Sequence, residues 1–455
     1  MSPEPLARPS GEDGTAPAFP RGTALPPEML AELPSDMAFA VWQVLRSVTL
    51  WTGEPEQRRA SMFDPAYMKA WEHRLLTAPL EPEARFPLAV IVGELAGPDQ
   101  GAGRLSWACV CVADWALGRG ATRAALSFAE AAARAAPEHP RYAWLVGRLM
   151  RSHGDPRGGE RWLRRALKLA VAQRDWETQA RALTGLGNLC VETGRYPEAR
   201  GLHTRSLRVS RRWHLREQEG MALHDLFVIA TEEGNRAEAE VHARGALDAY
   251  DGSTPRVCTL AHDVAYSWMA QGYFDRALPV FQALRPRFGR PDDELRVVGN
   301  IARAAGGSGN EALFGRMRMD ADALLGRLVT RETLAPALLE IALGAAALGQ
   351  HAAALDSARA AITAAQARNE TNVRMRAESL IQALSGAYPA AGAAGERRTS
   401  YAAASGERLA EDLVEAIRHE AAAAHARSGR RWRDDAGEDG VYAGFEDAPP
   451  EPALG

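Results

Sequence analysis

Four residues of one short segment combine the side chains that proteins use to hold an anionic partner. Arg141, Arg148 and Arg151 are spaced along a stretch with helical periodicity, and Trp144 lies between them. A guanidinium group binds a carboxylate or phosphate through two parallel hydrogen bonds, and an indole ring beside it offers an apolar anchor. The segment therefore indicates a binding site for a polar, negatively charged ligand.

Two His-Asp pairs could support a different chemistry. His224-Asp225 and His262-Asp263 occupy the same place in consecutive helical units, and an imidazole beside a carboxylate can ligate a metal ion or relay a proton. No third ligand converges on either pair in the sequence, and consecutive units can keep similar residues for shape alone. We therefore predict no metal, no cofactor and no catalytic residue, and keep a metal-dependent enzyme as a third alternative.

Helices must position these side chains, and the stretch 178–213 shows how. It predicts two short helices joined by a tight turn, in which Gly194 can take the left-handed conformation and Pro197 fits the first turn of the second helix. Gly187 and Ala199 are small where the helices would touch. One hairpin cannot bury its apolar face alone, so it needs stacked neighbours. The helical spacing is carried by Leu183, Leu186 and Cys190 before the turn and by Ala199, His203, Ser206 and Leu207 after it.

This hairpin resembles a tetratricopeptide repeat. The residues that match the family pattern are Leu183, Leu186, Gly187, Gly194, Tyr196 and Ala199. The departures are His203 and Ser206, where the family more often has a large apolar residue and Ala, and Arg211, where it often has Pro. The resemblance implies an architecture of stacked helical hairpins and, in general terms, protein or peptide binding.

Turn glycines mark seven such hairpins at intervals of 34, 40, 40, 38, 34 and 43 residues. A period near 40 exceeds the roughly 34 of the standard repeat, as in some bacterial regulators. The sixth unit has two other candidate turn glycines, so its register stays open. The predicted turn residues are Gly120, Gly154, Gly194, Gly234, Gly272, Gly306 and Gly349, and the residues early in each second helix are Ala125, Gly159, Ala199, Ala239, Ala277, Glu311 and Ala354.

The predicted fold class is all-α: an α-solenoid, a right-handed superhelix of helix-turn-helix repeats, with an N-terminal helical bundle or cap. Residues 1–24 form a Pro- and Gly-rich lead that we expect to be disordered, and residues 25–100 hold three helices, the first capped by Ser35. Residues 103–384 hold about seven repeats and a capping helix. Residues 385–455 hold an Ala/Gly-rich linker, one helix at 407–426 and an acidic tail.

The cysteines, the N-terminal sequence and the distribution of apolar residues indicate the compartment of the protein. The four cysteines, Cys109, Cys111, Cys190 and Cys258, are too scattered for a disulfide framework and are expected to be core residues in a reducing compartment. The N-terminus lacks a basic start followed by an apolar run, and no segment offers the ~18 apolar residues of a membrane span. We expect a cytoplasmic protein with no membrane partner.

The first helices of such a solenoid line its concave face, where ligands usually lie. Asn188 and Asn300 fall where the resemblance to carboxylate-clamping family members would place an Asn that holds a peptide backbone or terminal carboxylate. The lysines that complete that clamp are not evident. The predicted partner-binding residues are Arg141, Trp144, Arg148, Arg151, Arg181, Asn188, His224, His262, Tyr266, Arg296, Asn300 and Arg303.

Charge supports an anionic partner more than the net value of −4 suggests. Between Pro140 and His214 there are 16 Arg or Lys and 6 Asp or Glu, an excess of +10. An alternative interpretation is that arginines of second helices, such as Arg164, Arg165 and Arg208, cover the convex surface. Nothing resembles a nucleic-acid recognition module, so we do not expect a nucleic-acid partner.

The predicted function is a non-enzymatic adaptor or scaffold that binds another protein or peptide, through an acidic or carboxylate-bearing segment, on its concave face. The alternative is a peptide-responsive signalling regulator, because a helical bundle followed by seven repeats is similar in layout to bacterial regulators whose bundle acts on a target protein. A further hypothesis places the acidic tail, which has seven acidic residues from Asp434 to Glu451, in the basic groove until a partner arrives.

Overall fold

The computed structural model describes residues 31–59, 61–78, 80–96, 102–250, 254–328, 331–386 and 400–434. Every regular element in these ranges is helical and none is a strand, which confirms the all-α prediction. The helices divide into two compact units, residues 1–229 and 230–455. The predicted lead at 1–24, the linker at 387–399 and the tail after residue 434 lie outside the described residues.

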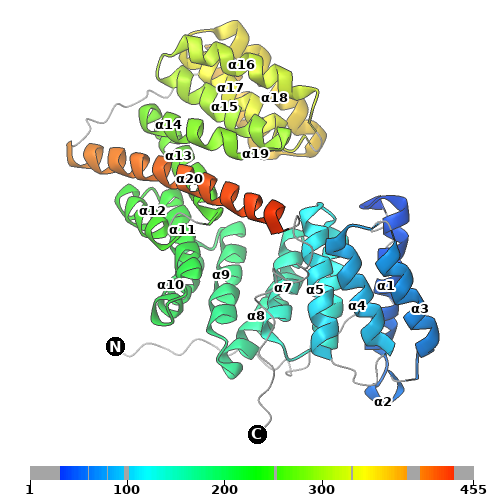
Figure 1. Ribbon diagram of the computed structural model, residues 1–455. Helices are drawn as coiled ribbons and strands as arrows, with labels where there is room; N and C mark the ends of the chain where they lie inside the picture. The colour runs from blue at the N-terminus through cyan, green and yellow to red at the C-terminus, as the bar shows by residue number, and fades with distance from the viewer. Residues whose placement is uncertain are drawn as a thin grey trace, which may run out of the picture. The chain divides into compact units, whose positions relative to one another are not determined.

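The first unit begins with four helices (Figure 1). They are α1 (Ser35–Gly53), α2 (Glu56–Arg59), α3 (Pro65–Thr77) and α4 (Pro82–Ala96). The prediction that Ser35 caps α1 is wrong, because Pro34 O already accepts the first helical hydrogen bond from Ala38 N at 2.7 Å and Ser35 lies inside the helix. Asp64 caps α3, since its Oδ2 accepts from Tyr67 N at 3.1 Å.

Three complete helical hairpins follow in the first unit. They are α5 (Ala102–Gly118) with α6 (Thr122–Ala135), α7 (Pro140–Ser152) with α8 (Pro156–Gln173), and α9 (Trp176–Glu192) with α10 (Tyr196–Arg212). One hydrophobic core runs from Leu33 in front of α1 to Ala182 in α9. The N-terminal helices therefore share the core of the first repeats, and α4 packs on α5 (Figure 1).

The turns of these hairpins are built as predicted. Gly120, Gly154 and Gly194 have positive φ angles of 75°, 84° and 72°, a conformation that costs glycine little because it lacks a Cβ. Aspartates that were not predicted as caps stand at the N-termini of α8 and α9. Asp155 Oδ1 accepts from Gly158 N at 2.8 Å, and Asp175 Oδ1 accepts from Thr178 N at 3.0 Å.

Helix α11 (Arg216–Glu232) contains the boundary between the units. The second unit continues with α12 (Arg236–Tyr250), α13 (Arg256–Ala270), α14 (Phe274–Leu284) and the short 3₁₀ helix η2 (Arg285–Arg287). It then holds α15 (Pro291–Gly307), α16 (Glu311–Leu325), α17 (Leu334–Ala347), α18 (His351–Arg368) and α19 (Thr371–Leu384). The last helix, α20 (Ser400–Asp434), includes the predicted helix 407–426.

The register of the sixth hairpin differs from the prediction. The residue with positive φ in its turn is Gly309, at 76°, and not Gly306. Gly306 lies inside α15, where an added Cβ would overlap the backbone of Gly344 in α17. The early position of the second helix is thus held by Phe314, which is buried, instead of Glu311, which is exposed. The prediction was wrong because Gly306 allows close contact between α15 and α17 and does not form the turn.

Candidate functional site

The predicted partner-binding residues all lie on first helices of the hairpins, but they divide between the two units. Arg141 to Arg151 lie on α7, Arg181 and Asn188 on α9, and His224 on α11. His262 and Tyr266 lie on α13, and Arg296, Asn300 and Arg303 lie on α15. We therefore consider a face of the first unit and a face of the second unit separately.

In the first unit, the ring of Trp144 of α7 has two arginines close to it. The Arg148 guanidinium carbon is 5.2 Å from the centre of the indole ring, and that of Arg181 in α9 is 5.1 Å from it. A guanidinium at this distance from an aromatic ring is attracted by the negative face of the ring. We call Arg148, Trp144 and Arg181 the Arg–Trp–Arg stack. All three are half-buried, so the stack is held in place and reachable from solvent.

The α7–α9 face also carries carboxylates. Arg151 pairs with Glu192 at 2.5 Å, and Arg181 Nη2 lies 2.6 Å from Glu177 Oε1. Burial raises the pKa of Asp114 on α5, although Arg148 and Arg141 act in the opposite direction. Arg141 is exposed. The face is therefore not uniformly basic. Carboxylates of the same chain partly neutralise its arginines.

Most of the local positive charge lies elsewhere. Of the 16 basic residues between Pro140 and His214, ten belong to the second helices α8 and α10. Several of these are engaged in surface ion pairs, such as Arg164 with Glu160 at 2.7 Å. The excess of +10 thus describes mainly the second helices, as the alternative interpretation supposed, and the Arg–Trp–Arg stack is the feature that distinguishes the first helices.

In the second unit, a buried carboxylate gathers the predicted residues Tyr266 and Arg303. Glu340 of α17 is 3% exposed. Its Oε1 accepts from Tyr266 Oη at 3.0 Å and from Arg376 Nη2 at 3.3 Å, and its Oε2 accepts from Arg303 Nη1 at 2.6 Å. Burial, followed by the nearby Glu340 charge, raises the pKa of Tyr266. We call this set the Glu340 network, and it links α13, α15, α17 and α19.

Asn300, a predicted partner-binding residue, lies inside the second unit. Asn300 is 2% exposed, and its Nδ2 lies 3.2 Å from His262 Nε2. His262 Nδ1 in turn lies 3.1 Å from Asp263 Oδ1. The amide is therefore used to orient the imidazole inside the unit. Arg296 is exposed, and Asn188 in the first unit is half-buried.

The His-Asp pairs do not assemble a metal centre in the part of the chain that the structure describes. No group of three or more His, Cys, Asp or Glu side chains placed to hold a metal ion occurs among those residues. His224 packs near Phe227, with ring centres 6.2 Å apart, while the carboxylate of Asp225 lies 3.3 Å from Nδ1 of the buried His203. The two pairs thus have different surroundings despite their matching positions.

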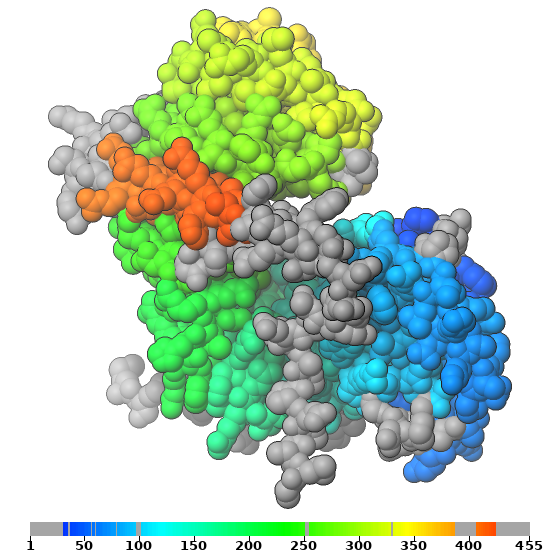
Figure 2. Space-filling view, in the orientation of Figure 1, coloured from blue at the N-terminus to red at the C-terminus, as the bar shows by residue number. Residues whose placement is uncertain are grey.

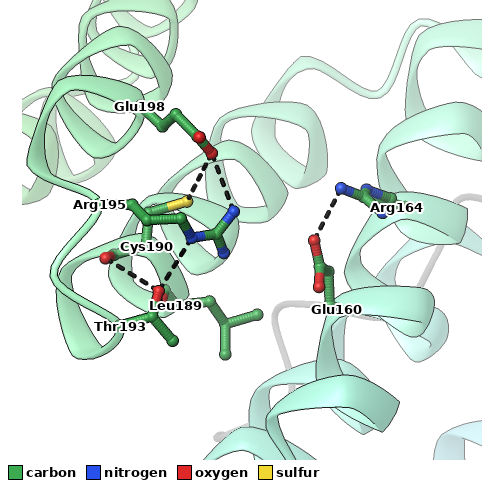
Figure 3. A network of polar contacts seen from close by, with 7 residues as sticks. All are labelled: Glu160, Arg164, Leu189, Cys190, Thr193, Arg195 and Glu198. Carbon is green, nitrogen blue, oxygen red and sulfur yellow. Dashed lines mark hydrogen bonds and ion pairs between the residues drawn. The ribbon is translucent and has the colours of Figure 1, made fainter. Parts of the chain in front are cut away.

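Cys190 lies at the turn of the third hairpin, in a polar cluster drawn in Figure 3. Its thiol lies 3.8 Å from Glu198 Oε2, which also accepts from Arg195 Nη1 at 2.9 Å. Arg195 Nε donates to Thr193 Oγ1 at 3.0 Å, and Thr193 Oγ1 donates to Leu189 O at 2.9 Å. Burial raises the pKa of Cys190 above its ordinary value. The cluster holds the turn, and its cysteine is a poor nucleophile because it stays protonated.

Two residues of the Glu340 network were not predicted from the sequence. Glu340 is the lone charged residue of the apolar helix LAPALLEIALGAAA, and an isolated carboxylate in such a helix signals a buried partner. Arg376 lies on α19, which was predicted only as a capping helix. Neither could be paired from the sequence, because their partners are 36 or more residues away.

No protein-family model and no curated protein matches this chain. Solved structures that resemble it include apo RapI, which is 14% identical over 72% of this chain and 99% of its own, with a TM-score of 0.47. PilF of Pseudomonas aeruginosa is 16% identical over 50% and 94% of the two chains, with a TM-score of 0.38. The TPR2AB domain of yeast Sti1 is 16% identical over 62% and 99%, with a TM-score of 0.24. These values are too low to transfer a ligand or a partner.

The hairpins themselves define the class. Paired helices recur with glycine at positive φ in the turn, and a small residue stands early in the second helix of every hairpin except the sixth, where Phe314 stands. The described part of the chain is therefore an array of helical hairpins, and these hairpins resemble tetratricopeptide repeats. Among the described helices, none is both long and apolar enough to cross a membrane.

Proposed function

We propose that this protein is a non-enzymatic adaptor that binds a protein or peptide on the α7–α9 face. The observation that supports this function is the Arg–Trp–Arg stack. Trp and Arg are the residue types that most often dominate the energy of protein interfaces. Here they are packed together on two neighbouring first helices and remain half-buried.

A carboxylate of the partner would compete with the internal carboxylates for the arginines of this face. The exposed Arg141 offers the first contact, and the guanidiniums of Arg148 and Arg181 are already oriented by the Trp144 ring. Holding the donors in place reduces the ordering cost that binding must overcome. The site needs no cofactor or metal, and Trp144 supplies apolar contact beside the ionic groups.

An array of short acidic peptides, each paired with its Asn/Gln counterpart, tests this function. The wild-type chain should retain a subset of the acidic peptides, and the Arg148→Glu/Arg181→Glu variant should bind them about tenfold more weakly or worse. The matched control is Arg205→Glu/Arg208→Glu, which makes the same charge change on the exposed side of α10. Equal loss in both variants would show that only net charge matters.

A second candidate function, a signalling regulator whose N-terminal bundle acts on a target protein, is favoured by a separate observation. Phe39, Tyr67 and Phe86 are 56%, 57% and 47% exposed on α1, α3 and α4. Arg74 lies 5.8 Å from the centre of the Tyr67 ring, and Arg85 lies 5.6 Å from that of Phe86. A target that binds here should be lost with Phe39→Ala/Tyr67→Ala and kept by the Arg148→Glu/Arg181→Glu variant.

We place this role in the cytoplasm because of the cysteines. All four are free thiols, two of them buried and two half-buried. Free thiols persist in reducing compartments, where disulfides are rare.

A further inference from the structure

The C-terminal helix packs against helices far back along the chain. Helix α20 lies on α12, α13 and α14, whereas α19, which precedes it in sequence, packs on α17 and α18. Figure 2 shows α20 in orange against the green helices of this region. A helix that simply ended the array would be expected to stack on the last hairpin. The position of α20 is instead that of a ligand on the surface of earlier repeats.

The contact has the pattern of an amphipathic helix on a receptor surface. Leu409, Leu413 and Ile417 recur at intervals of four residues and are each no more than 1% exposed, and Glu420 continues the same face at 2%. Gly406 begins this face, and the Arg276 side chain of α14 occupies the space that a Cβ there would fill. Apolar anchors at this spacing are the usual means by which a groove reads a helix.

Charge complementarity fixes the register of the helix. Arg244 Nη1 of α12 lies 2.9 Å from Asp412 Oδ2 of α20. Arg287 of η2 pairs with the buried carboxylate of Glu420, which also lies 4.0 Å from the Cys258 thiol. A buried carboxylate is costly without its cationic partner, so the surface selects a helix that presents an acid in this position.

We propose that the α12–α14 surface is a second binding site, specific for an amphipathic helix with an acidic residue at the end of its apolar face. Its resident occupant is α20, and a helix of the same pattern from another protein displaces it. Only three large apolar side chains of the described part of α20 are fully buried in the contact, and residues 387–399 join it to α19. A tethered helix with so few anchors competes with an external helix for the surface. It increases the affinity that the external helix needs, but it does not prevent that helix from binding.

A labelled synthetic peptide with the sequence of residues 404–424 tests this proposal on the full-length chain. The peptide should bind the Leu413→Asp chain at least about tenfold more tightly than the wild-type chain, because the resident helix of the variant no longer competes. A peptide that itself carries Leu413→Asp should not bind either chain. Absence of binding to the Leu413→Asp chain would mean that α20 is an integral part of the fold, and equal binding to both chains would mean that the peptide lies elsewhere. Either result overturns the proposal.

Circular dichroism would show whether Leu413→Asp disturbs folding. If it does, a second test exchanges the charges of Arg287 in the chain and Glu420 in the peptide. In the Arg287→Glu chain, the wild-type peptide should lose affinity, and a peptide carrying Glu420→Arg should regain it. The matched control is Arg359→Glu on α18, whose side chain is 68% exposed. The assignment of the surface is contradicted if the Glu420→Arg peptide gains affinity for the Arg359→Glu chain. It is also contradicted if that peptide does not gain affinity for the Arg287→Glu chain. This site is separate from the α7–α9 face, so the two proposals fail independently.

Discussion

At the scale of single residues, the contact of Gly187 with His203 explains one departure of this hairpin from the tetratricopeptide pattern that it resembles. The His203 ring fills the space beside Gly187, and a Cβ at that position would overlap it. His203 is fully buried, so the ring has little room to move. The sequence predicted that Gly187 lies in the helix contact but could not say that the histidine fills it.

Gly187→Ala should therefore destabilise the protein by about 1–3 kcal/mol, as overpacking of a core does. Gly201→Ala in α10 is the matched control, because no heavy atom lies within 4 Å of the position of its Cβ. That change should be neutral or stabilise by up to about 1 kcal/mol, since alanine favours helix over glycine. Urea unfolding of both variants measures the difference, and equal effects would contradict the packing described for α9 and α10.

His203 should also make stability depend on pH. Burial lowers its pKa below the ordinary value of 6.5, although Asp225 acts in the opposite direction. In the pH range below about 6.5 the unfolded chain takes up a proton that the folded chain binds less readily, so acid favours unfolding. This contribution to stability is present above that pH and is lost as the pH falls, by at most about 1.4 kcal/mol per pH unit.

The measurement is the urea midpoint as a function of pH for wild type and His203→Gln. The slope below pH 6.5 should decrease in the variant, whatever the change in absolute stability. The matched control is His351→Gln, which makes the same substitution at an exposed histidine. A steeper slope in His203→Gln would contradict the assignment.

At the scale of helices, the Glu340 network is a polar contact shared by several helices of the second unit. It connects α13, α15, α17 and α19 through one carboxylate that is almost fully buried. Removing one partner from a buried ionic group leaves the other charges uncompensated, which costs several kcal/mol. Tyr266 and Arg303, which were predicted to contact a peptide, both donate to this carboxylate and so contribute to the helix packing.

Glu340→Ala should destabilise the second unit by about 3 kcal/mol, because Arg303 would keep a charge with a side chain that is 15% exposed. Glu378→Ala removes an exposed carboxylate that lies 3.7 Å from Arg374 and should cost no more than about 1 kcal/mol. Thermal unfolding compares the two. If Glu340→Ala costs as little as Glu378→Ala, the network does not stabilise the helix packing.

Local rules predicted the helices well and their distant contacts poorly. Turn glycines and small residues at helix contacts are set by neighbours within one hairpin, so six of the seven predicted turns hold and only Gly306 fails. The Arg–Trp–Arg stack brings Arg181 to Trp144 from the next hairpin, and the docking of α20 joins Asp412 to Arg244 across 168 residues. Contacts of this kind depend on how repeats stack, which spacing within one helix does not encode.

At the scale of the whole molecule, we propose a different binding surface for each of the two units. The first unit presents a preorganised aromatic and cationic face on α7 and α9, and the second unit binds its own C-terminal helix on α12–α14. Both proposals use stacked hairpins as binding surfaces. The central claim is that the α7–α9 face receives the partner.

Hydrogen–deuterium exchange of the full-length chain, with and without an acidic peptide selected on the array, tests this claim most directly. The amides of α7 and α9 should exchange more slowly when the peptide binds. That protection should be lost in Arg148→Glu/Arg181→Glu and kept in Arg205→Glu/Arg208→Glu. Protection confined to α1–α4, or to the second helices α8 and α10, would contradict it.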